Sequence, residues 1–534
     1  MAADAVWRVS GRVGVTMATS GPGATNLITG IACSYFDSIP SLHITGQVNQ
    51  QESSTYLGAN VRQAGFQETR IVEMVKPITK YAVMVRSPEE LRHELAKAYA
   101  IAISGRMGPV LIDVPMDVQQ ASMEGPIKLP ELDRLSTESV TVVSHALATT
   151  LLEAKRPLVL VGAGVGLAGV QLQVSEWLTR SGLSWVSSWA ALSFINHDHS
   201  GFCGQIGVYG NRGANFVLQN ADAVIVLGSR LDNRQRSGNP VNFASGAVIH
   251  VVDVDFEELK KYAQDNYRCS HLDFKQLPEV LQAVTAPRPD DEWNDYIAEM
   301  KSQYYHKETS TSALKLNSLS PYDVVRRINE VIDCDAVVIG DTGAAVCWLF
   351  QAFQVKEHTL FTSGGNSPMG YALPASIGAK LTAPARQVVS YNGDGGFQLN
   401  IQELQTIAAL NLEIAIVIMN NNSYGIIKQF QDSYLGSRYA ASRDGYTTPD
   451  FGRIAAAYGI RYARIEDVSQ ITPDLFSGKP IVIEVVLSEN TLVEPKLEMG
   501  RPINDQFPYL TPDEYDAGNR FVRYPRPAKM QDKS

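Results

Sequence analysis

The sequence predicts an α/β fold of three successive parallel-sheet domains, on three observations. Short, continuous apolar runs recur along the chain, as expected for strands that a sheet buries on both faces. Helical patterns separate these runs, which is the rhythm of a parallel sheet with crossover helices. The length of 534 residues exceeds what one hydrophobic core supports. We therefore expect domains at 1–118, 138–285 and 318–490, followed by a tail at 491–534.

The apolar runs give the expected strands in chain order. They lie at 13–19 and 41–45 in the first domain, at 157–161, 223–227 and 247–252 in the second, and at 336–339, 387–390, 414–419 and 480–486 in the third. Polar stretches at 119–138 and 286–320 interrupt the pattern, so we expect them to be linkers.

Composition excludes several classes of protein. The 46 Lys and Arg against 56 Asp and Glu give a net charge of -10, which disfavours binding to nucleic acids or anionic membranes. The five cysteines form no CxxC pair, so neither a disulfide framework nor a zinc site is indicated. No signal peptide and no apolar run of membrane-spanning length is present. We expect a cytoplasmic protein without a nucleic-acid or membrane partner.

The most informative motif is formed by polar residues that follow two strands of the third domain. GDGG at 393–396 ends one strand and NNN at 420–422 ends the next. Ligands of open parallel sheets bind at the carboxyl ends of strands. Carboxylate and amide oxygens suit Mg²⁺, while glycines let backbone N–H groups approach phosphate. A turn and a loop are the alternative reading. The two donors, Asp394 and Asn421, lie 27 residues apart (421 - 394), and as a pair they suit a Mg-diphosphate.

With its surroundings, GDGGFQLNIQELQTIAALNL and NNNSYGIIKQFQ, this motif resembles the thiamine-diphosphate-dependent enzymes, and among them the acetolactate synthase branch. The resemblance implies that the metal is bound by Asp394, Asn421 and the backbone carbonyl of Ser423. It also implies that the diphosphate lies against Gly393, Gly395 and Gly396.

The first domain carries a second signature of the same family. TSGPGATNLITGIACSYFDSIPSLHITGQV resembles the pyrimidine-binding domain, which implies that Pro22 and Asn26 contact the aminopyrimidine ring. GFQE at 65–68 matches a segment whose Phe66 and Gln67 line the active site. In the third domain, Met369 within SGGNSPMGYALP matches the apolar residue that props the cofactor into a V shape. A capped helix after a Gly-Pro turn and a core methionine are the alternatives.

The middle domain contains GAGVGLAG at 162–169, which satisfies GxGxxG after a strand. No acidic residue stands about 20 residues further on, so a hydride-transferring dehydrogenase is not indicated. RPLVLVGAGVGLAG, LGSRLDNR and HVVDVDFEELKK resemble the central domain of acetolactate synthases, which binds FAD. The resemblance implies flavin contacts at Gly164 and Arg230. It places Arg234 against the carboxylate of the second substrate, a surface arginine being the alternative.

The resemblance implies a carboligase that decarboxylates pyruvate and transfers the two-carbon unit to a second carbonyl, as in branched-chain amino acid biosynthesis. The expected cofactors are thiamine diphosphate, Mg²⁺ and FAD. The family builds each site from two subunits, so we expect a homodimer or homotetramer. Two alternatives stay open: a related decarboxylase or acetyl-transferring enzyme with another acceptor, such as a keto sugar, and a non-catalytic cofactor-binding homologue. Neither GxSxG nor HExxH supports a hydrolase.

The chain departs from the family pattern at two places. The activating Glu of the family, in a phrase like HEQAAAMAAD, aligns before Met1, as does a first βα unit on the order of 50 residues. We expect a truncated gene model. The acceptor site also differs, because other residues stand where the family has Trp, two Met, His and Asp: these are Phe430, Ile426, Val208, Tyr209 and Asn233. GAAV at 343–346 replaces the GQHQ that contacts the diphosphate in the family. The triplet at 197–199, His-Asp-His, lacks a third ligand and is expected to be a loop.

Overall fold

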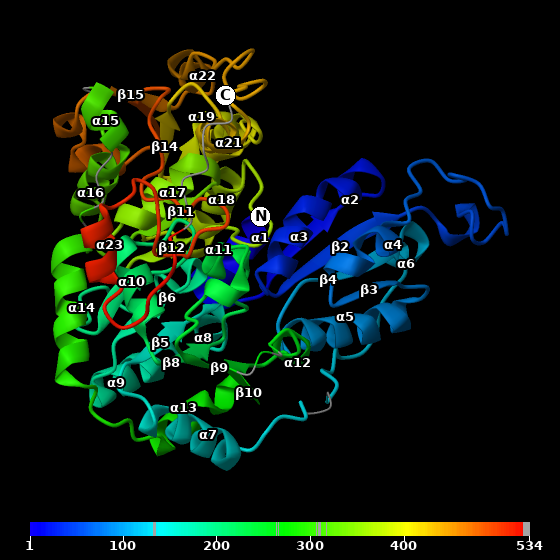
Figure 1. The fold of residues 1–534 in the computed structure, drawn as a ribbon. Helices are drawn as coiled ribbons and strands as arrows, with labels where there is room; N and C mark the ends of the chain where they lie inside the picture. Colours follow the sequence, from blue (N-terminus) through cyan, green and yellow to red (C-terminus); the bar gives the residue numbers. More distant parts are fainter. Residues whose placement is uncertain are drawn as a thin grey trace.

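Three parallel sheets with helices between their strands make up the protein, which confirms the expected α/β fold (Figure 1). The computed structural model describes residues 1–526 except 132–134, 263, 265, 306, 308–310 and 317. The expected linker at 119–138 and the expected tail therefore lie partly outside the described residues.

The first domain contains a four-stranded sheet in the order β1-β2-β4-β3. Its strands are β1 (Gly14–Ala18), β2 (Ser41–Gln47), β3 (Tyr81–Met84) and β4 (Val110–Pro115). Its helices are α1 (Ala2–Ser10), α2 (Pro22–Asn26), α3 (Ile28–Phe36), α4 (Ile71–Val75), α5 (Pro88–Ala102) and α6 (Met116–Gln120). The edge strand β1 leaves Val15 and Met17 exposed, at 55% and 80%.

The middle domain has six strands in the order β10-β9-β8-β5-β6-β7. They are β5 (Pro157–Val161), β6 (Trp185–Ser187), β7 (Phe202–Gln205), β8 (Ala223–Leu227), β9 (Val248–Asp253) and β10 (Tyr267–His271). The helices are α7 (Val140–Leu152), α8 (Ala163–Leu167), α9 (Gln171–Ser181), α10 (Arg212–Asn220), α11 (Asn233–Arg236), α12 (Phe256–Leu259), α13 (Leu277–Ala283) and α14 (Asp291–Tyr304). The central strands β5 and β8 are buried throughout, as their apolar sequences require.

The third domain has six strands in the order β12-β11-β13-β14-β16-β15. They are β11 (Val337–Gly340), β12 (Thr359–Phe361), β13 (Val388–Gly393), β14 (Ile414–Asn420), β15 (Arg461–Ile465) and β16 (Ile481–Val486). The helices are α15 (Thr311–Leu316), α16 (Pro321–Val331), α17 (Gly343–Ala352), α18 (Ala372–Thr382), α19 (Asp394–Gln398), α20 (Glu403–Ala409), α21 (Gly425–Tyr434) and α22 (Phe451–Ala457). The strand order reverses between β11 and β13, where open sheets form a ligand crevice.

The expected linker at 286–320 is wrong in part, because α14 occupies much of it. The helix buries Trp293, Tyr296, Ile297 and Met300 and points its charged residues outward. Its many polar residues concealed an amphipathic helix with apolar residues three and four apart.

The tail after β16 is folded, and does not dissolve into an irregular extension. Up to residue 526, it runs back over the middle domain and contains α23 (Pro512–Gly518), which lies beside α10 (Figure 1). Asn504 and Gln506 are fully buried in it. The side chain of Asn220 on α10 donates to the Gly518 carbonyl oxygen (2.9 Å). Polar side chains thus replace the apolar pattern that would have revealed this packing in the sequence.

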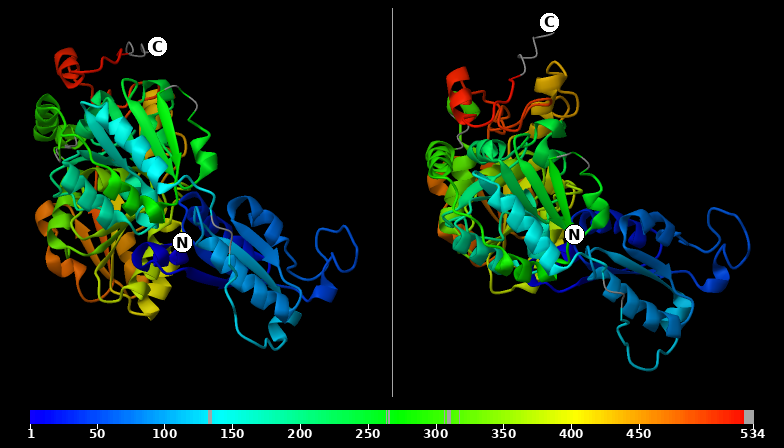
Figure 2. Two further views of the ribbon diagram at one scale, coloured as in Figure 1. Left: turned by 90° about the horizontal axis from the view of Figure 1, so that it is seen from below. Right: turned by 60° about the horizontal axis from the view of Figure 1, so that its bottom comes forward.

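The first domain projects from a body formed by the middle and third domains, as two views show (Figure 2). Helix α1 lies between the first and third domains and packs against α18. Arg8 on α1 pairs with Asp4 (2.7 Å) and Asp37 (2.6 Å), and Asp37 accepts hydrogen bonds from the backbone of Gly364 and Gly365. Within the described residues, no helix is long and apolar enough to cross a membrane.

Candidate functional site

The two polar motifs of the third domain meet at one edge of its sheet. Gly393 pairs with Met419 in register, so the ends of β13 and β14 lie side by side. Asp394 begins α19 immediately after β13, and its carboxylate faces the backbone amides of Asn422 and Ser423. Asp394 and Asn421, which are 27 residues apart in the sequence, therefore lie close together in the fold.

The Asp394 side chain has the environment of a metal ligand. The residue is 2% exposed, and its Oδ1 accepts a hydrogen bond from the Gly395 N–H (2.8 Å). Its Oδ2 is buried without a hydrogen bond of ordinary geometry among the described residues, although the Tyr446 hydroxyl faces the carboxylate. Burial raises the pKa of Asp394 to about 6, against the hydrogen bonds that lower it. A buried carboxylate oxygen without a partner is unfavourable unless a cation or donor joins it.

Asn421 and Ser423 are buried beside this carboxylate, at 3% and 2% exposure. The Asn421 amide nitrogen donates to Ser423 Oγ (3.0 Å), so the amide oxygen points the other way. Carboxylate, amide and carbonyl oxygens at one strand edge form a donor set that suits Mg²⁺. Within the described residues, no group of three or more His, Cys, Asp and Glu gathers as a metal site, and this oxygen set is of a different kind.

Protein packing accounts for glycine at two positions of the GDGG motif. A Cβ at Gly395 would overlap the ring of Tyr424, and a Cβ at Gly396 would overlap the carboxylate of Asp341. Gly393 has only an ordinary contact with Ala345. Contact of these glycines with a diphosphate stays a prediction.

Asp341 is a site residue that sequence reasoning missed. It follows β11 at the crevice and is 1% exposed, and burial raises its pKa to about 6. Its carboxylate accepts hydrogen bonds from the N–H groups of Gly370 and Ala372 (both 3.2 Å). Met369 therefore stands on a turn that Asp341 holds against the GDGG motif. The only sequence signal was an Asp directly after a strand.

The predicted pyrimidine-binding residues gather in the first domain. Pro22 is the first residue and Asn26 the last of α2, which follows Gly21 in a left-handed conformation (φ 61°). The side chain of Gln67 packs where a Cβ at Gly21 would lie, 2.9 Å from its Cβ. Pro22 and Asn26 are exposed, and Phe66 is 86% exposed. Within one chain α2 lies well apart from α19, so the two halves of the predicted site do not meet (Figure 1).

The predicted flavin residues lie at the carboxyl ends of β5 and β8. The Gly164 N–H donates to the Gly228 carbonyl oxygen (2.9 Å), and a Cβ at Gly164 would lie 2.9 Å from the Gly228 Cα. Arg230 donates to the carbonyl oxygen of Phe36 (3.1 Å) and pairs with Asp232 (3.2 Å). The glycine turn therefore serves close packing of two loops, and Arg230 joins the middle domain to the first.

Arg234 lies in the short helix α11 with an exposed side chain. Its carbonyl oxygen accepts a hydrogen bond from the Val208 N–H (2.7 Å). This bond brings together two loops that the sequence comparison assigned to the acceptor site.

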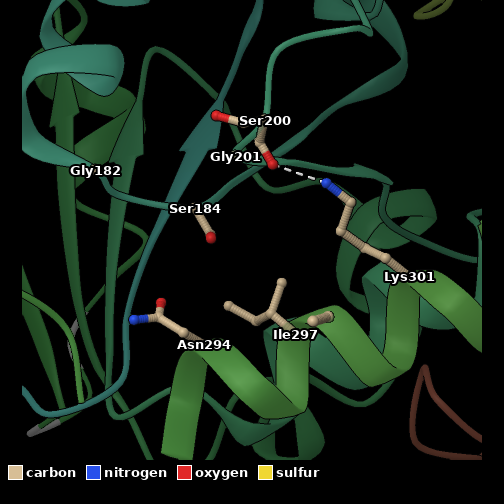
Figure 3. A pocket seen from close by; sticks show the side chains of 8 residues that line it. Gly182, Ser184, Ser200, Gly201, Asn294, Ile297 and Lys301 are labelled. Carbon is tan, nitrogen blue, oxygen red and sulfur yellow. Dashed lines mark hydrogen bonds between the residues drawn. The ribbon is translucent and has the colours of Figure 1, made fainter. Parts of the chain in front are cut away.

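Two other features, His199 and a surface pocket, lie outside the predicted cofactor and substrate sites. His199 accepts hydrogen bonds from Trp185 and Gly201, as expected of a residue that orders a loop. A pocket of about 460 Å³ lies at the amino end of β6, away from the carboxyl-end sites (Figure 3). Lys301 in this pocket donates to the Ser200 carbonyl oxygen (2.8 Å).

Comparisons with known proteins agree with this geometry. The N-terminal TPP binding domain, the central domain and the C-terminal TPP binding domain of thiamine pyrophosphate enzymes match residues 1–74, 144–271 and 341–485. The acetolactate synthase large subunit of Lactococcus lactis is 32% identical over 506 residues, covering 93% of this chain and 85% of that protein. The isozyme 2 large subunit of Escherichia coli K12 is 32% identical over 510 residues, covering 94% and 89%.

The Corynebacterium glutamicum acetolactate synthase large subunit is likewise 32% identical over 524 residues, covering 94% of this chain and 81% of that protein. The domains match in the same order as the three sheets, and the third match contains the buried oxygen donors. The chain therefore belongs to the thiamine pyrophosphate enzymes, in the family of acetolactate synthase large subunits, as a thiamine-diphosphate-dependent carboligase of that type.

Proposed function

We propose that this enzyme decarboxylates pyruvate with Mg²⁺ and thiamine diphosphate and joins the two-carbon unit to a second carbonyl. The observation that carries the proposal is the buried, unpartnered Oδ2 of Asp394 beside Asn421 and the backbone of Ser423. When bound, the thiazolium ring supplies the electron sink for decarboxylation.

The residues of the third domain would hold the cofactor in position. Asp394, Asn421 and the Ser423 carbonyl would hold Mg²⁺, whose charge would then offset the buried carboxylate. Gly393 would offer the open face of the motif to the diphosphate, since Gly395 and Gly396 are packed against Tyr424 and Asp341. Met369, on the turn that Asp341 holds, would support the bent form of the cofactor.

The pyrimidine half of each site would come from a second copy of the chain. Pro22, Asn26 and Phe66 are exposed. Helix α2, which carries the first two, lies away from α19 of its own chain (Figure 1). Large apolar side chains that stay exposed on one face mark an interaction surface. A homodimer, alone or paired into a tetramer, would bring Pro22 and Asn26 to the aminopyrimidine ring of the partner's cofactor, and Phe66 and Gln67 to the active site beside it.

A flavin and the acceptor would both use the middle domain. Ser187 Oγ and Gln205 Oε1 are buried without partners, among the described residues, at the ends of β6 and β7. They fit a polar ligand such as FAD, which Gly164 and Arg230 would approach from β5 and β8. The exposed guanidinium of Arg234 would take the carboxylate of the second substrate.

The proposal is tested with Asp394→Ala in the full chain. Loss of a direct metal ligand is expected to weaken Mg-thiamine diphosphate binding more than roughly 100-fold, above the effect of losing an outer partner. Cofactor binding is measured by fluorescence quenching, and CO₂ release from pyruvate is measured in parallel. Asp335→Asn, at a half-exposed carboxylate just before the amino end of β11, is the control. Absence of CO₂ release from pyruvate by the wild-type holoenzyme would refute the proposal.

A further inference from the structure

Gln67, which is predicted to line the active site, has a backbone conformation that its residue type disfavours. It is the third residue of a tight turn, which the Glu68 N–H closes by donating to the Gly65 carbonyl oxygen (3.0 Å). Its φ of 65° lies in the left-handed region, where such a turn prefers glycine. Strain of this kind persists only where the surroundings enforce it, and it is concentrated at functional sites. The contacts that enforce this conformation therefore bear on how the Gln67 side chain is aimed.

The chain directly after this turn is held by the side-chain amide of Gln47, the last residue of β2. Gln47 Nε2 donates to the Thr69 carbonyl oxygen (2.6 Å), and Gln47 Oε1 accepts from the Thr69 N–H (3.4 Å). Gln47 is 8% exposed, so water competes little for these bonds. The Thr69 hydroxyl in turn donates to the Gln67 carbonyl oxygen (3.2 Å). One amide thus binds both backbone groups of the residue that leads back to Gln67.

Asp113 on β4 fixes which way round the Gln47 amide lies. Thr45 pairs in register with Asp113, and Gln47 lies two residues after Thr45, so the three side chains share one face of the sheet. The Asp113 carboxylate accepts from Thr45 Oγ1 (2.7 Å) and from Gln47 Nε2 (3.0 Å). Because an ionised carboxylate only accepts, it selects the orientation of the amide that leaves Oε1 for the Thr69 N–H.

Burial also indicates that Asp113 has a role other than stability. The residue is 1% exposed, and burial raises its pKa to about 6, against the hydrogen bonds that lower it. A buried carboxylate costs free energy of folding, and acids kept in such a place are enriched at functional sites.

The loop before the turn is held separately, by the carboxylate of Glu68. Its Oε1 accepts from the N–H (2.8 Å) and the hydroxyl (2.7 Å) of Ser54, and its Oε2 accepts from the Ala64 N–H (2.8 Å). Glu68 therefore fastens the turn to its own loop, whereas Gln47 fastens it to the sheet. Gln67 lies between these two attachments and packs against Gly21, at the start of the predicted pyrimidine loop.

We propose that Gln47 and Asp113 are positioning residues, which hold the turn on the sheet so that the Gln67 side chain stays in place against Gly21. The inference rests on the proposed function and on the predicted role of Gln67. Asp113 orients the amide, the amide binds Thr69, and Thr69 leads back to Gln67. A displacement of about 1 Å at a reacting group can lower a rate about 100-fold, so the effect of losing these contacts is measurable.

The test measures CO₂ release from pyruvate by the full chain loaded with Mg²⁺ and thiamine diphosphate. Gln47→Met keeps the side-chain length and removes the amide, so it is expected to lower kcat about tenfold or more. The thiamine diphosphate concentration for half-maximal activity is expected to stay within about threefold, because the Asp394 edge is unchanged.

Two substitutions of Asp113 separate orientation from simple packing. Asp113→Leu is expected to act like Gln47→Met, because Gln47 Nε2 loses its acceptor. Asp113→Asn is expected to keep kcat within about threefold, because the new amide can accept from Gln47 and donate to Thr45 Oγ1.

Gln50→Met is the matched control. Gln50 Nε2 also joins a carboxylate, that of Asp117 (2.8 Å), to a backbone carbonyl, that of Arg86 (3.0 Å), but it binds a different segment of the first domain. This variant is expected to leave kcat unchanged.

Hydrogen exchange of the cofactor-free chain measures the Gln47 contact without catalysis. The amides of Glu68 and Thr69 are expected to exchange about tenfold faster in Gln47→Met, because the turn opens locally once the contact is lost. In Gln50→Met and Asp113→Asn their exchange is expected to stay within about threefold of the wild type.

Several outcomes overturn the inference. An unchanged kcat in Gln47→Met does so whatever the exchange shows, and unchanged exchange at Glu68 and Thr69 does so whatever the rate. An equal loss of kcat in Gln47→Met and Gln50→Met would show a general effect on the first domain. Equal rates in Asp113→Leu and Asp113→Asn would remove the role given to Asp113.

Failure of the proposed function is a separate result. If the wild-type holoenzyme releases no CO₂, the proposed function fails and hydrogen exchange alone decides: faster exchange in Gln47→Met and not in Gln50→Met supports the contact, and equal exchange overturns it. If Gln47→Met does not fold, Gln47→Asn takes its place with the same expectations. Its amide is one methylene shorter and is not expected to reach Thr69 and Asp113 together.

Discussion

The first and third domains have related parallel sheets, yet their ligand edges differ in exposure. In the third domain Asp394, Asn421 and Ser423 are almost completely buried, and Asp341 holds the neighbouring turn. In the first domain Pro22, Asn26 and Phe66 lie open to solvent. The edge of the third domain is preorganised within a single chain. The edge of the first domain exposes the residues that are predicted to complete the cofactor site.

This difference shows how a two-part site can be stable before its parts meet. The buried edge is destabilised by the unpartnered oxygen of Asp394 and by the burial that raises the pKa of Asp394 and Asp341. A bound cation would offset both effects. The open edge exposes apolar surface to solvent, and a second copy of the chain would cover this surface. The following changes are meant to break or sharpen the contrast.

The largest effect on stability is expected at the ion pairs of Arg8 with Asp4 and Asp37, which connect the first and third domains. We call these ion pairs the Arg8 clamp. Arg8 lies between Asp4 and Asp37, and Asp4 is 1% exposed. Arg8→Met would leave buried carboxylates uncompensated, which costs about 3–5 kcal/mol of the free energy of unfolding. Chemical denaturation of the cofactor-free chain measures it.

The control for this clamp is Arg12→Met, whose guanidinium donates to the exposed Ser10 Oγ and, within the described part of the chain, forms no ion pair. A change within about 0.5 kcal/mol is expected there. If Arg8→Met were equally mild, α1 would not couple the first domain to the third, and the open edge would owe its position to other contacts.

A smaller effect is expected at the open edge itself. Phe66→Glu should raise the dimer dissociation constant about 100-fold, since it puts a charge into an apolar contact, and should leave subunit stability within about 0.5 kcal/mol. Sedimentation and activity are measured against protein concentration. Leu152→Glu, at a 69% exposed leucine of the middle domain, is the comparison. Equal dissociation in both variants would show that Phe66 lies outside the interface.

The two edges also differ in how far the sequence could predict them. The GDGG and NNN motifs were predictable as one site, because the ends of neighbouring parallel strands meet at one edge of the sheet. Asp341 was not, since its significance depends on packing between segments distant in the chain. Helix α14 and the folded tail were missed because both segments are rich in polar residues, as linkers are. In α14 the polar side chains point outward, and in the tail some of them are buried in hydrogen bonds.

Per pH unit, the smallest effect concerns acid sensitivity, which both domains share through a buried, neutral histidine. His43 on β2 lies between Thr16 Oγ1 (2.7 Å) and Ser41 Oγ (2.9 Å), and burial lowers its pKa to about 3. Burial lowers the pKa of His358, before β12, to about 4. The unfolded chain takes up these protons near pH 6.5, so below that pH it binds more protons than the folded chain. Stability should therefore fall with acid, by up to about 1.4 kcal/mol per pH unit for each histidine.

Hydrogen exchange can separate the two domains, because it reports opening at individual strands. After correction for intrinsic exchange rates, protection of β2 and of β12 should both fall between pH 6.5 and 4.5. His43→Gln should flatten the pH dependence at β2 and leave β12 unchanged, and His358→Gln should do the reverse. If either variant flattened both, the first and third domains would open as one cooperative unit through the Arg8 clamp. The contrast between their edges would then concern ligand access and not stability.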